Sequence, residues 1–284
     1  MNRRVFIRNG ALVSLLTVPG LTSFLDKKRY SLGVCTSVNN SHLLKKYGYD
    51  FVEDQVRKFL VPRENEETFE QNLKKLKSAQ LPVYAVNSFL PGDIKSVGDD
   101  MNENVLLEYA DTSFKRAKQA GVKIIVYGSG GSRKIPDGFS HKRAKEQFIS
   151  LLVKMAPLAE KQGIIICLEP LKRDATNFIN TVSEGGEIVA KVNHPHVKMV
   201  VDFYHMLCNN ENPRDIEKLK GKVAHCHIAE EKERRPPGTY GENFRSFFKA
   251  LQKINYSGKV SIECRWKNLE DELPVAYQTI MEQS

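Results

Sequence analysis

The chain has 284 residues, of which 41% are hydrophobic and 27% charged, and this composition excludes disordered, collagen-like and coiled-coil proteins. The formal net charge is +9, but six basic residues and a single acidic residue fall within residues 1–29. The rest of the chain therefore carries a net charge of only +4, so the charge does not indicate a nucleic-acid partner.

The first residues are typical of an export signal. The pair Arg3-Arg4 is followed by an apolar stretch from Gly10 to Leu25, with small residues at Thr22 and Ser23. This pattern predicts a signal peptide over residues 1–25, of the twin-arginine type, and a periplasmic protein. A Sec-type signal or an uncleaved anchor is the alternative. Beyond the leader no apolar run reaches the ~20 residues of a membrane span, so no other membrane attachment is expected.

After the leader, short β-branched runs alternate with amphipathic stretches to the end of the chain. Helical spacing is clear where Phe148, Leu151, Leu152 and Met155 recur at i, i+3, i+4 and i+7, and Pro157 should kink or end that helix. Eight strands are predicted at Ser31–Cys35, Asp50–Glu53, Pro82–Asn87, Val122–Tyr127, Ile164–Glu169, Val197–Asp202, Lys222–His227 and Lys259–Glu263. Eight strand–helix alternations predict a single (β/α)8 TIM barrel over residues 29–284, with a doubly wound sheet as the alternative.

Four metal-competent side chains stand at the ends of four consecutive predicted strands, namely Glu169, Asp202, His227 and Glu263. In a barrel, the C-terminal ends of the strands share one mouth, where active sites are built. Three carboxylates and one imidazole form an open site for one divalent ion; Mn²⁺, Co²⁺ and Mg²⁺ suit these ligands best, and Zn²⁺ is also compatible. The structural alternative is that each is a capped or salt-bridged strand-end residue.

Further polar residues near this mouth are candidates for binding a substrate. His205 follows Asp202 by three residues and can reach the same pocket. Arg234 and Arg235 come just after the strand that ends at His227, where they either bind substrate oxygens or remain solvated.

Two other candidates come from the strands themselves. His225 alternates onto the same face of its strand as His227, so it either contacts substrate or supports the site from behind. Glu53 ends the second predicted strand and either binds substrate or forms a structural ion pair. The glycine-rich loop from Gly128 to Phe139 lacks the dinucleotide and P-loop patterns; it either meets a sugar or an anion, or makes a tight turn that frees the mouth.

The segments LEPLKRDATNFINT, VVDFYH, HCHIAE followed by Arg-Arg-Pro-Pro-Gly, and SIECRW resemble the xylose isomerase-like TIM barrel superfamily. The similarity runs from about residue 30 to the end and is strongest to the sugar isomerase/epimerase branch typified by D-tagatose 3-epimerase. It implies that the four ligands named above bind one divalent ion and that Glu169 and Glu263 are the proton-transfer pair. It also implies that His205 and Arg234 contact oxygens of a small sugar. The expected activity is a metal-dependent isomerisation or epimerisation of a sugar through a metal-stabilised enediolate.

The match departs from the family around the substrate. Members commonly carry a second glutamate six residues after the first metal glutamate, and here Ala175 takes that position while Lys172 replaces an asparagine. The sugar therefore stays open, as do two alternatives: a lyase, dehydratase or keto-glycoside-processing enzyme on the same metal site, and a non-catalytic sugar-binding barrel.

DNA-repair enzymes of the endonuclease IV type belong to the same superfamily and use a three-metal cluster with additional histidines from strands 2 to 4. Here Glu53, Asn87 and Gly128 stand at those strand ends, so no nucleic-acid partner is expected. A homo-oligomer is compatible with the sequence, and five cysteines, an odd number, argue against a disulfide scaffold.

Overall fold

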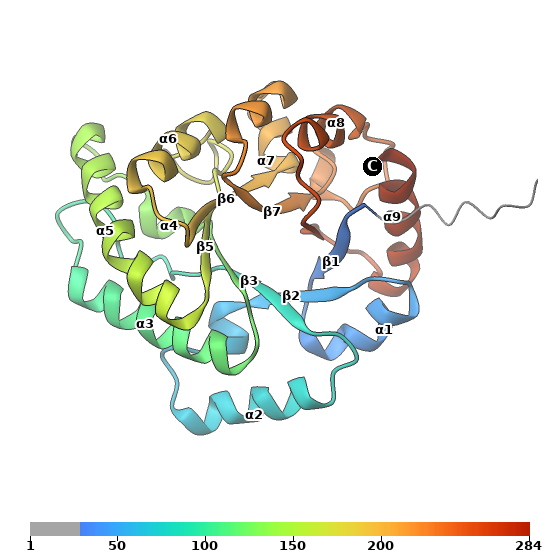
Figure 1. The fold of residues 1–284 in the computed structure, drawn as a ribbon, viewed down its shortest axis with the longest axis horizontal. Helices are drawn as coiled ribbons and strands as arrows, with labels where there is room; N and C mark the ends of the chain where they lie inside the picture. The colour runs from blue at the N-terminus through green and yellow to red at the C-terminus, as the bar shows by residue number, and fades with distance from the viewer. Residues whose placement is uncertain (1–28) are drawn as a thin grey trace, which may run out of the picture.

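The computed structural model describes residues 29–284 and shows a closed barrel of eight parallel strands in sequence order (Figure 1). The predicted TIM barrel is therefore confirmed, whereas the predicted signal over residues 1–25 lies outside the described residues. The strands are β1 (Ser31–Cys35), β2 (Phe51–Gln55), β3 (Val83–Asn87), β4 (Ile124–Tyr127), β5 (Ile165–Leu168), β6 (Val197–Asp202), β7 (Val223–Ile228) and β8 (Lys259–Ile262). Their ends differ from the predicted ends by at most two residues, as expected where terminal pairing frays.

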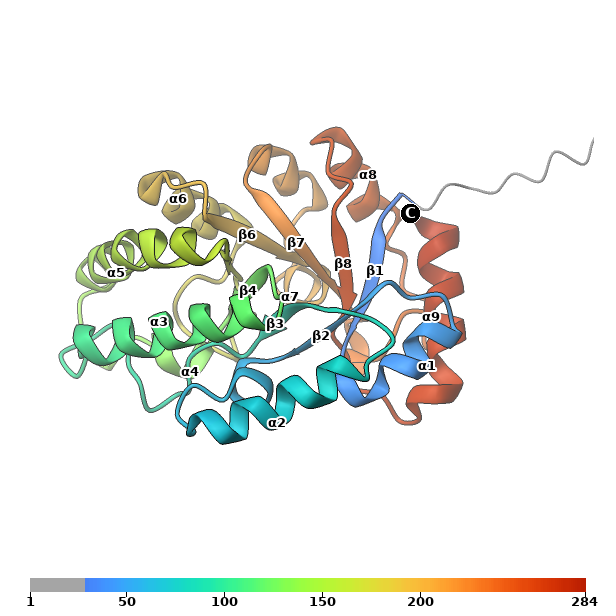
Figure 2. The ribbon, with the colours of Figure 1, turned by 60° about the horizontal axis from the view of Figure 1, so that its bottom comes forward.

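Helices surround the barrel on its outside (Figures 1 and 2). They are α1 (Ser41–Lys46), α2 (Glu66–Lys77), α3 (Glu103–Gln119), α4 (Gly130–Arg133), α5 (His141–Gln162), α6 (Val182–Val192), α7 (Phe203–Cys208), α8 (Arg245–Lys253) and α9 (Leu269–Gln283). Polar N-caps define several starts, since the side chains of Asn65, Asn102, Ser140 and Thr181 each accept a backbone N–H of the first turn. Within residues 29–284, no helix is both long and apolar enough to cross a bilayer.

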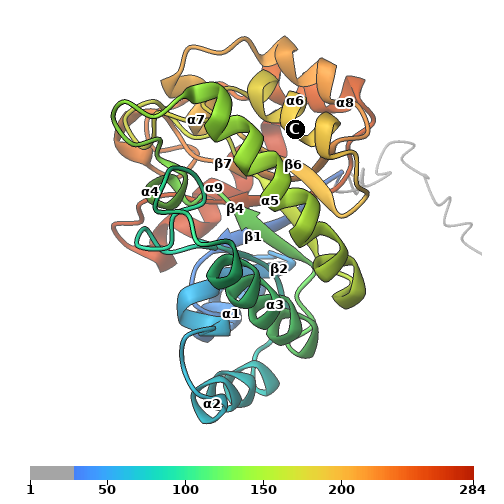
Figure 3. The same ribbon diagram turned by 90° about the vertical axis from the view of Figure 1, so that its left-hand side faces the viewer.

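Pro157 does not end helix α5, so of the two effects predicted for this proline the ending is excluded. The helix continues for five residues beyond the proline, to Gln162, and lies beside α3 (Figure 3). Proline removes the hydrogen bond that would reach the carbonyl of Val153. Val153 is 49% exposed, so water can satisfy that carbonyl and the helix tolerates the loss.

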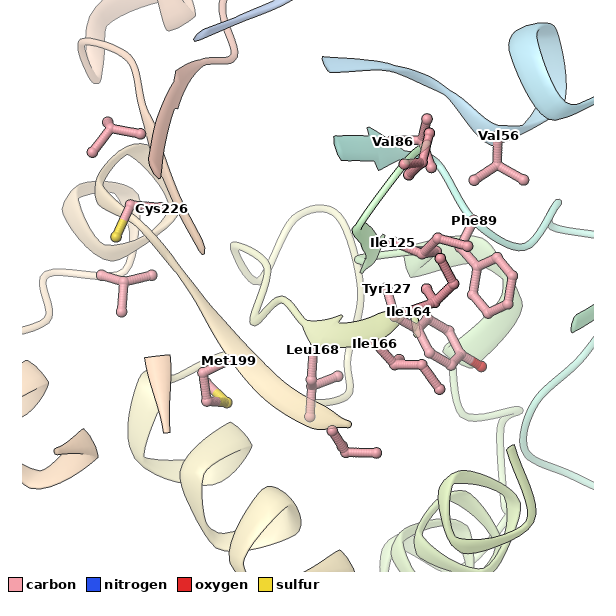
Figure 4. Packing of buried hydrophobic residues seen from close by; sticks show 14 of the residues in the cluster. Val56, Val86, Phe89, Ile125, Tyr127, Ile164, Ile166, Leu168, Met199 and Cys226 are labelled. Atoms are coloured by element: carbon pink, nitrogen blue, oxygen red, sulfur yellow. The ribbon is translucent and has the colours of Figure 1, made fainter. Parts of the chain in front are cut away.

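Two apolar layers hold the barrel. On β4, Ile125 and Tyr127 face the helices and pack with Phe89, whose ring lies edge-on to that of Tyr127 at 5.3 Å between centroids (Figure 4). The alternate residues Ile124 and Val126 belong to a separate small cluster, which we place inside the barrel. Alternate strand residues therefore point outward to the helices and inward to the barrel. At the C-terminal strand ends, polar side chains can occupy the inward positions.

Candidate metal and substrate site

The four predicted ligands meet at one point of the barrel mouth. Glu169 follows β5, Asp202 ends β6, His227 lies in β7 and Glu263 follows β8. One ligand atom from each of the four lies within 4.8 Å of the ligand atoms of the other three. The first three side chains are almost fully buried, while Glu263 keeps 24% of its side chain exposed and faces the cavity.

The charges of this cluster are strongly coupled. Burial disfavours a charged imidazolium, but the carboxylates of Glu53, Glu263 and Glu169 outweigh it and raise the pKa of His227 well above its usual value. Burial raises the pKa of both Glu169 and Asp202. Burial acts in the same direction on Glu263, but Arg234 and His227 overcome it and lower the pKa of Glu263 to about 2.

Asp202 provides a test of whether these residues fit a metal ion. Its Oδ1 accepts the backbone N–H of His205 at 3.2 Å and so caps α7. Its Oδ2 is buried and makes no hydrogen bond within residues 29–284, although Arg234 Nη2 lies in ion-pair range at 3.6 Å. A buried carboxylate oxygen without a donor is costly, and a cation would satisfy it. The residues therefore fit a divalent ion held by three carboxylates and one imidazole.

Glu53 sets the orientation of His227. The imidazole Nδ1 lies 2.7 Å from Glu169 Oε1 and faces the ligand cluster, while Nε2 lies 2.9 Å from Glu53 Oε1 on the opposite side of the ring. The other oxygen, Glu53 Oε2, lies 2.7 Å from Nε2 of His225. Both oxygens of Glu53 are thus used by histidines, and the carboxylate keeps the Nε2–H tautomer that leaves Nδ1 free for a ligand.

The positions of Glu53 and His225 match one of the two alternatives left open for each of them. His225 is fully buried below the ligands, and Glu53 is only 1% exposed. Both therefore lie behind the predicted ligands, as the structural alternatives for Glu53 and His225 describe, and substrate binding by either residue stays a prediction. The sequence missed the contact because it crosses the barrel from β2 to β7.

His205 lies beside the cluster with a defined tautomer. Its Nδ1 accepts the backbone N–H of Lys172 at 3.1 Å, so the ring proton is on Nε2. That Nε2 lies 3.6 Å from Asp202 Oδ2. Burial lowers the pKa of His205 to about 4, so at neutral pH the side chain is an uncharged hydrogen-bond donor.

The two adjacent arginines have different roles. Arg234 Nη2 donates to Glu263 Oε2 at 2.6 Å, and its guanidinium lies 4.6 Å from the centre of the Tyr204 ring. Arg235 is buried and bonds the backbone carbonyl of Arg265 and the carboxylate of Glu272. Arg234 thus contacts the predicted ligands, whereas Arg235 anchors the loop. The backbone is left-handed at Glu233 (φ 59°) and Arg234 (φ 53°), and this turn lets the two adjacent side chains point in different directions.

A cavity of about 470 Å³ opens at this mouth, of the size that small-molecule sites have. Glu263, Arg234 and Asn87, which ends β3, are among the residues that line it. Asn87 Nδ2 lies 3.3 Å from Glu263 Oε1, a contact that the sequence did not reveal.

Gly128 explains part of the glycine-rich loop after β4. A Cβ at this position would lie 2.3 Å from Glu169 Oε2, so only glycine lets this ligand approach the end of β4. This close approach accounts for Gly128, and the loop then forms the short helix α4.

Comparison with known proteins supports this assignment of the fold. The sequence profile of the xylose isomerase-like TIM barrel family matches residues 42–282. An L-ribulose 3-epimerase of Methylomonas sp. is 29% identical over 171 residues, which cover 51% of this chain and 59% of that protein. A 3-dehydro-D-guloside 4-epimerase of Escherichia coli is 31% identical over 109 residues, covering 38% of this chain and 41% of that protein. The alignments thus span about half the length of these relatives.

Solved structures extend the likeness of the fold over nearly the whole barrel. The crystal structure of a 3-keto-D-glucoside 4-epimerase from E. coli superposes with a TM-score of 0.75 at 22% identity, covering 89% of this chain and 99% of that one. A D-allulose 3-epimerase from Methylomonas sp., in complex with D-allulose, gives a TM-score of 0.77 at 20% identity, covering 90% and 98%.

Proposed function

The chain belongs to the xylose isomerase-like TIM barrel family, and from this premise we propose that it is a divalent-metal-dependent isomerase or epimerase of a keto-sugar or sugar derivative. The observation that carries the proposal is the convergence of Glu169, Asp202, His227 and Glu263 within 4.8 Å, beside a cavity of sugar-binding size. Relatives that act on ketoses support the same class.

The four ligands would hold Mn²⁺, Co²⁺ or Mg²⁺, with Zn²⁺ also compatible, and the ion would act as a Lewis acid on the carbonyl and a neighbouring hydroxyl of the sugar. His205, with its proton on Nε2 and a pKa of about 4, donates a hydrogen bond to a substrate oxygen without adding a charge. Arg234 donates to another oxygen and holds Glu263 in place at 2.6 Å.

Glu263 and Glu169 are the proton-transfer pair. Glu263 stays ionised because Arg234 and His227 lower its pKa to about 2, and its carboxylate lines the cavity, so it takes the carbon-bound proton. Glu169, whose pKa is raised by burial, stands at the other end of the ligand row and returns a proton in an epimerisation. In an isomerisation the proton returns to the neighbouring carbon from the same carboxylate.

The test is proton exchange at the sugar carbon. The enzyme is stripped with chelator, reloaded with Mn²⁺ and incubated with D-fructose and D-allulose in heavy water, and deuterium uptake next to the carbonyl is measured by mass spectrometry. The Glu263→Gln variant should fold and bind metal but lose exchange by about a thousandfold or more, as expected for a general base. Near-normal exchange in this variant would show that Glu263 is not the base.

A lyase or keto-glycoside-processing enzyme on the same metal site is the second candidate. Lys172 favours it, because its ammonium lies 5.8 Å from the centre of the Tyr204 ring, which Arg234 also contacts, and an ammonium there can protonate a leaving group. The same first deprotonation would then be followed by loss of the neighbouring substituent. Release of an aglycone from a keto-glycoside, with no epimer formed, would identify this reaction.

We also propose, from residues 1–25, that the protein is exported to the periplasm. A fusion of residues 1–30 to a reporter that functions only after export tests this directly. Loss of export when Arg3 and Arg4 are both changed to Lys would identify the twin-arginine route, and unchanged export would indicate a Sec-type signal.

A further inference from the structure

The cavity beside the metal ligands carries positive charge that the proposed chemistry does not use. Besides Arg234, three cationic side chains line it: Lys58 after β2, Lys75 on α2 and Arg265 after β8. All three are exposed, and within residues 29–284 none of them has a carboxylate within 4.0 Å.

The three carboxylates that line the same cavity, those of Glu53, Asp54 and Glu263, each have close partners of their own. Glu53 is shared by two histidines, and Glu263 is paired with Arg234. Asp54 uses Oδ2 to accept the N–H of Val38 at 2.8 Å and Oδ1 to accept that of Gln55 at 2.7 Å. Lys58 and Lys75 attract the Asp54 carboxylate through space, but none of the three cations forms an ion pair with a carboxylate of this substrate-sized cavity.

The backbone that presents Lys58 is firmly built. It lies in a π-helical turn, Val56–Leu60, which ends at Val61 in a left-handed conformation (φ 44°) that a β-branched residue rarely adopts. Asn72 on α2 donates to the carbonyls of Lys58 and Phe59 at 2.9 and 3.0 Å.

A second clamp comes from α3, where buried Arg116 donates to the carbonyls of Leu60, Val61 and Glu64. Residues in rare conformations persist only where the surroundings hold them, and they cluster at ligand sites.

The other two cations are also held in position. Lys75 Nζ donates to Asn72 Oδ1 at 3.0 Å, which ties its ammonium to the same side chain that fixes the turn. The backbone of Arg265 is fixed on both sides, because its N–H donates to the carbonyl of Arg234 at 2.7 Å and its carbonyl accepts from Arg235 at 2.6 Å.

We infer that Lys58, Lys75 and Arg265 form an anion subsite, and that the natural substrate is a sugar carrying a carboxylate, phosphate or sulfate away from its reacting carbon. This inference rests on the proposed function and adds the substrate class. Such a group would receive charge-assisted hydrogen bonds from all three cations, which a neutral ketose cannot.

The test measures binding of sugar alcohols and acids that cannot react, so that it does not depend on catalysis. The Mn²⁺-loaded enzyme is titrated by calorimetry with D-glucitol, D-gluconate and D-glucitol 6-phosphate. Both anions should bind about tenfold more tightly than D-glucitol at low salt, and the advantage should shrink in 0.5 M NaCl. The tighter of the two identifies a carboxylate or a phosphate as the preferred group.

Two matched triple variants locate the effect. Lys58→Gln, Lys75→Gln and Arg265→Gln together should abolish the preference for anions while keeping one Mn²⁺ per chain. The control removes the same charge from exposed neighbours outside the cavity, at Lys74, Lys77 and Lys267. It should bind all three probes like the wild type.

Equal affinity for D-glucitol and both anions would overturn the inference. A preference for anions that survives in the Lys58, Lys75 and Arg265 triple variant would also overturn it, because the anion would then bind at the metal. Failure of the proposed function looks different, because neither D-fructose and D-allulose nor the anionic D-fructose 6-phosphate would then show deuterium exchange, whichever probe binds. The two failures are therefore distinguishable.

Discussion

From the contact between Glu53 and His227 we predict that tight metal binding requires the carboxylate of Glu53. In Glu53→Gln the side-chain volume is kept, but an amide replaces a carboxylate that accepts from both His225 and His227. The amide oxygen can serve only one ring, and the NH₂ group meets the Nε2 of the other. If that ring is His227, its proton must move to Nδ1, the nitrogen that faces the ligands.

The expected cost follows from the role of such supporting groups. Losing a partner behind a metal-bound histidine weakens metal binding by about 10–100-fold, or about 1.4–2.8 kcal/mol. At a free Mn²⁺ concentration of about 100 times the wild-type Kd, the metal stabilises the wild-type fold by about 2.7 kcal/mol. A 100-fold weaker site would retain only about 0.4 kcal/mol of this stabilisation.

The assay is a Mn²⁺ titration against a competing chelator, with thermal unfolding of the metal-free and loaded protein in parallel. Asp54→Asn is the matched control, because Asp54 is the adjacent buried carboxylate and bonds only backbone N–H groups. If Glu53→Gln binds Mn²⁺ like the wild type, or if Asp54→Asn loses as much affinity as Glu53→Gln, then the contact of Glu53 with His227 does not support metal binding.

Three further predictions follow from other residues. Gly128→Ala should weaken Mn²⁺ binding at least about tenfold, because the new Cβ would lie 2.3 Å from Glu169 Oε2. Gly131→Ala is the control in the same titration. Its new Cβ would have no atom closer than 3.4 Å, so this variant should bind Mn²⁺ normally. Metal binding should release a proton, because the flanking carboxylates raise the pKa of His227 well above its usual value. Calorimetry in buffers of different ionisation enthalpy should show this release. An Mn²⁺ affinity that does not fall from pH 8 to pH 5 would contradict the prediction. Burial raises the pKa of Glu211 from 4.5 to about 7, so the folded protein holds a proton in this window that the unfolded chain lacks, and stability falls as pH rises through it. Glu211→Gln should therefore be more stable than the wild type by about 1–2 kcal/mol at pH 8, allowing for solvent screening, with little difference near pH 5, as measured by urea unfolding.

The barrel and the ligand row were predictable because both depend on spacing along the chain. Glu169, Asp202, His227 and Glu263 are separated by roughly one strand–helix unit each, and consecutive strands of a parallel barrel end at the same rim. The anchoring of Glu53 was not predictable, since its partners lie on β7 and the pairing depends on how the barrel closes. The division of labour between Arg234 and Arg235 depends on a left-handed turn that their sequence does not specify.

The same alternation that builds the core also explains why this site depends on the barrel as a whole. On β7, His225 and His227 point inward while Cys226, between them, packs in the outer core. Glu53 reaches both histidines only because β2 and β7 face each other across a closed barrel. A shift of β7 by one residue would turn Cys226 inward and both imidazoles into the apolar layer, where neither could bind a metal. The orientation of the His227 imidazole is thus set by closure of the barrel, and we expect the proposed metal binding and barrel stability to be lost together in variants that loosen β1 from β8.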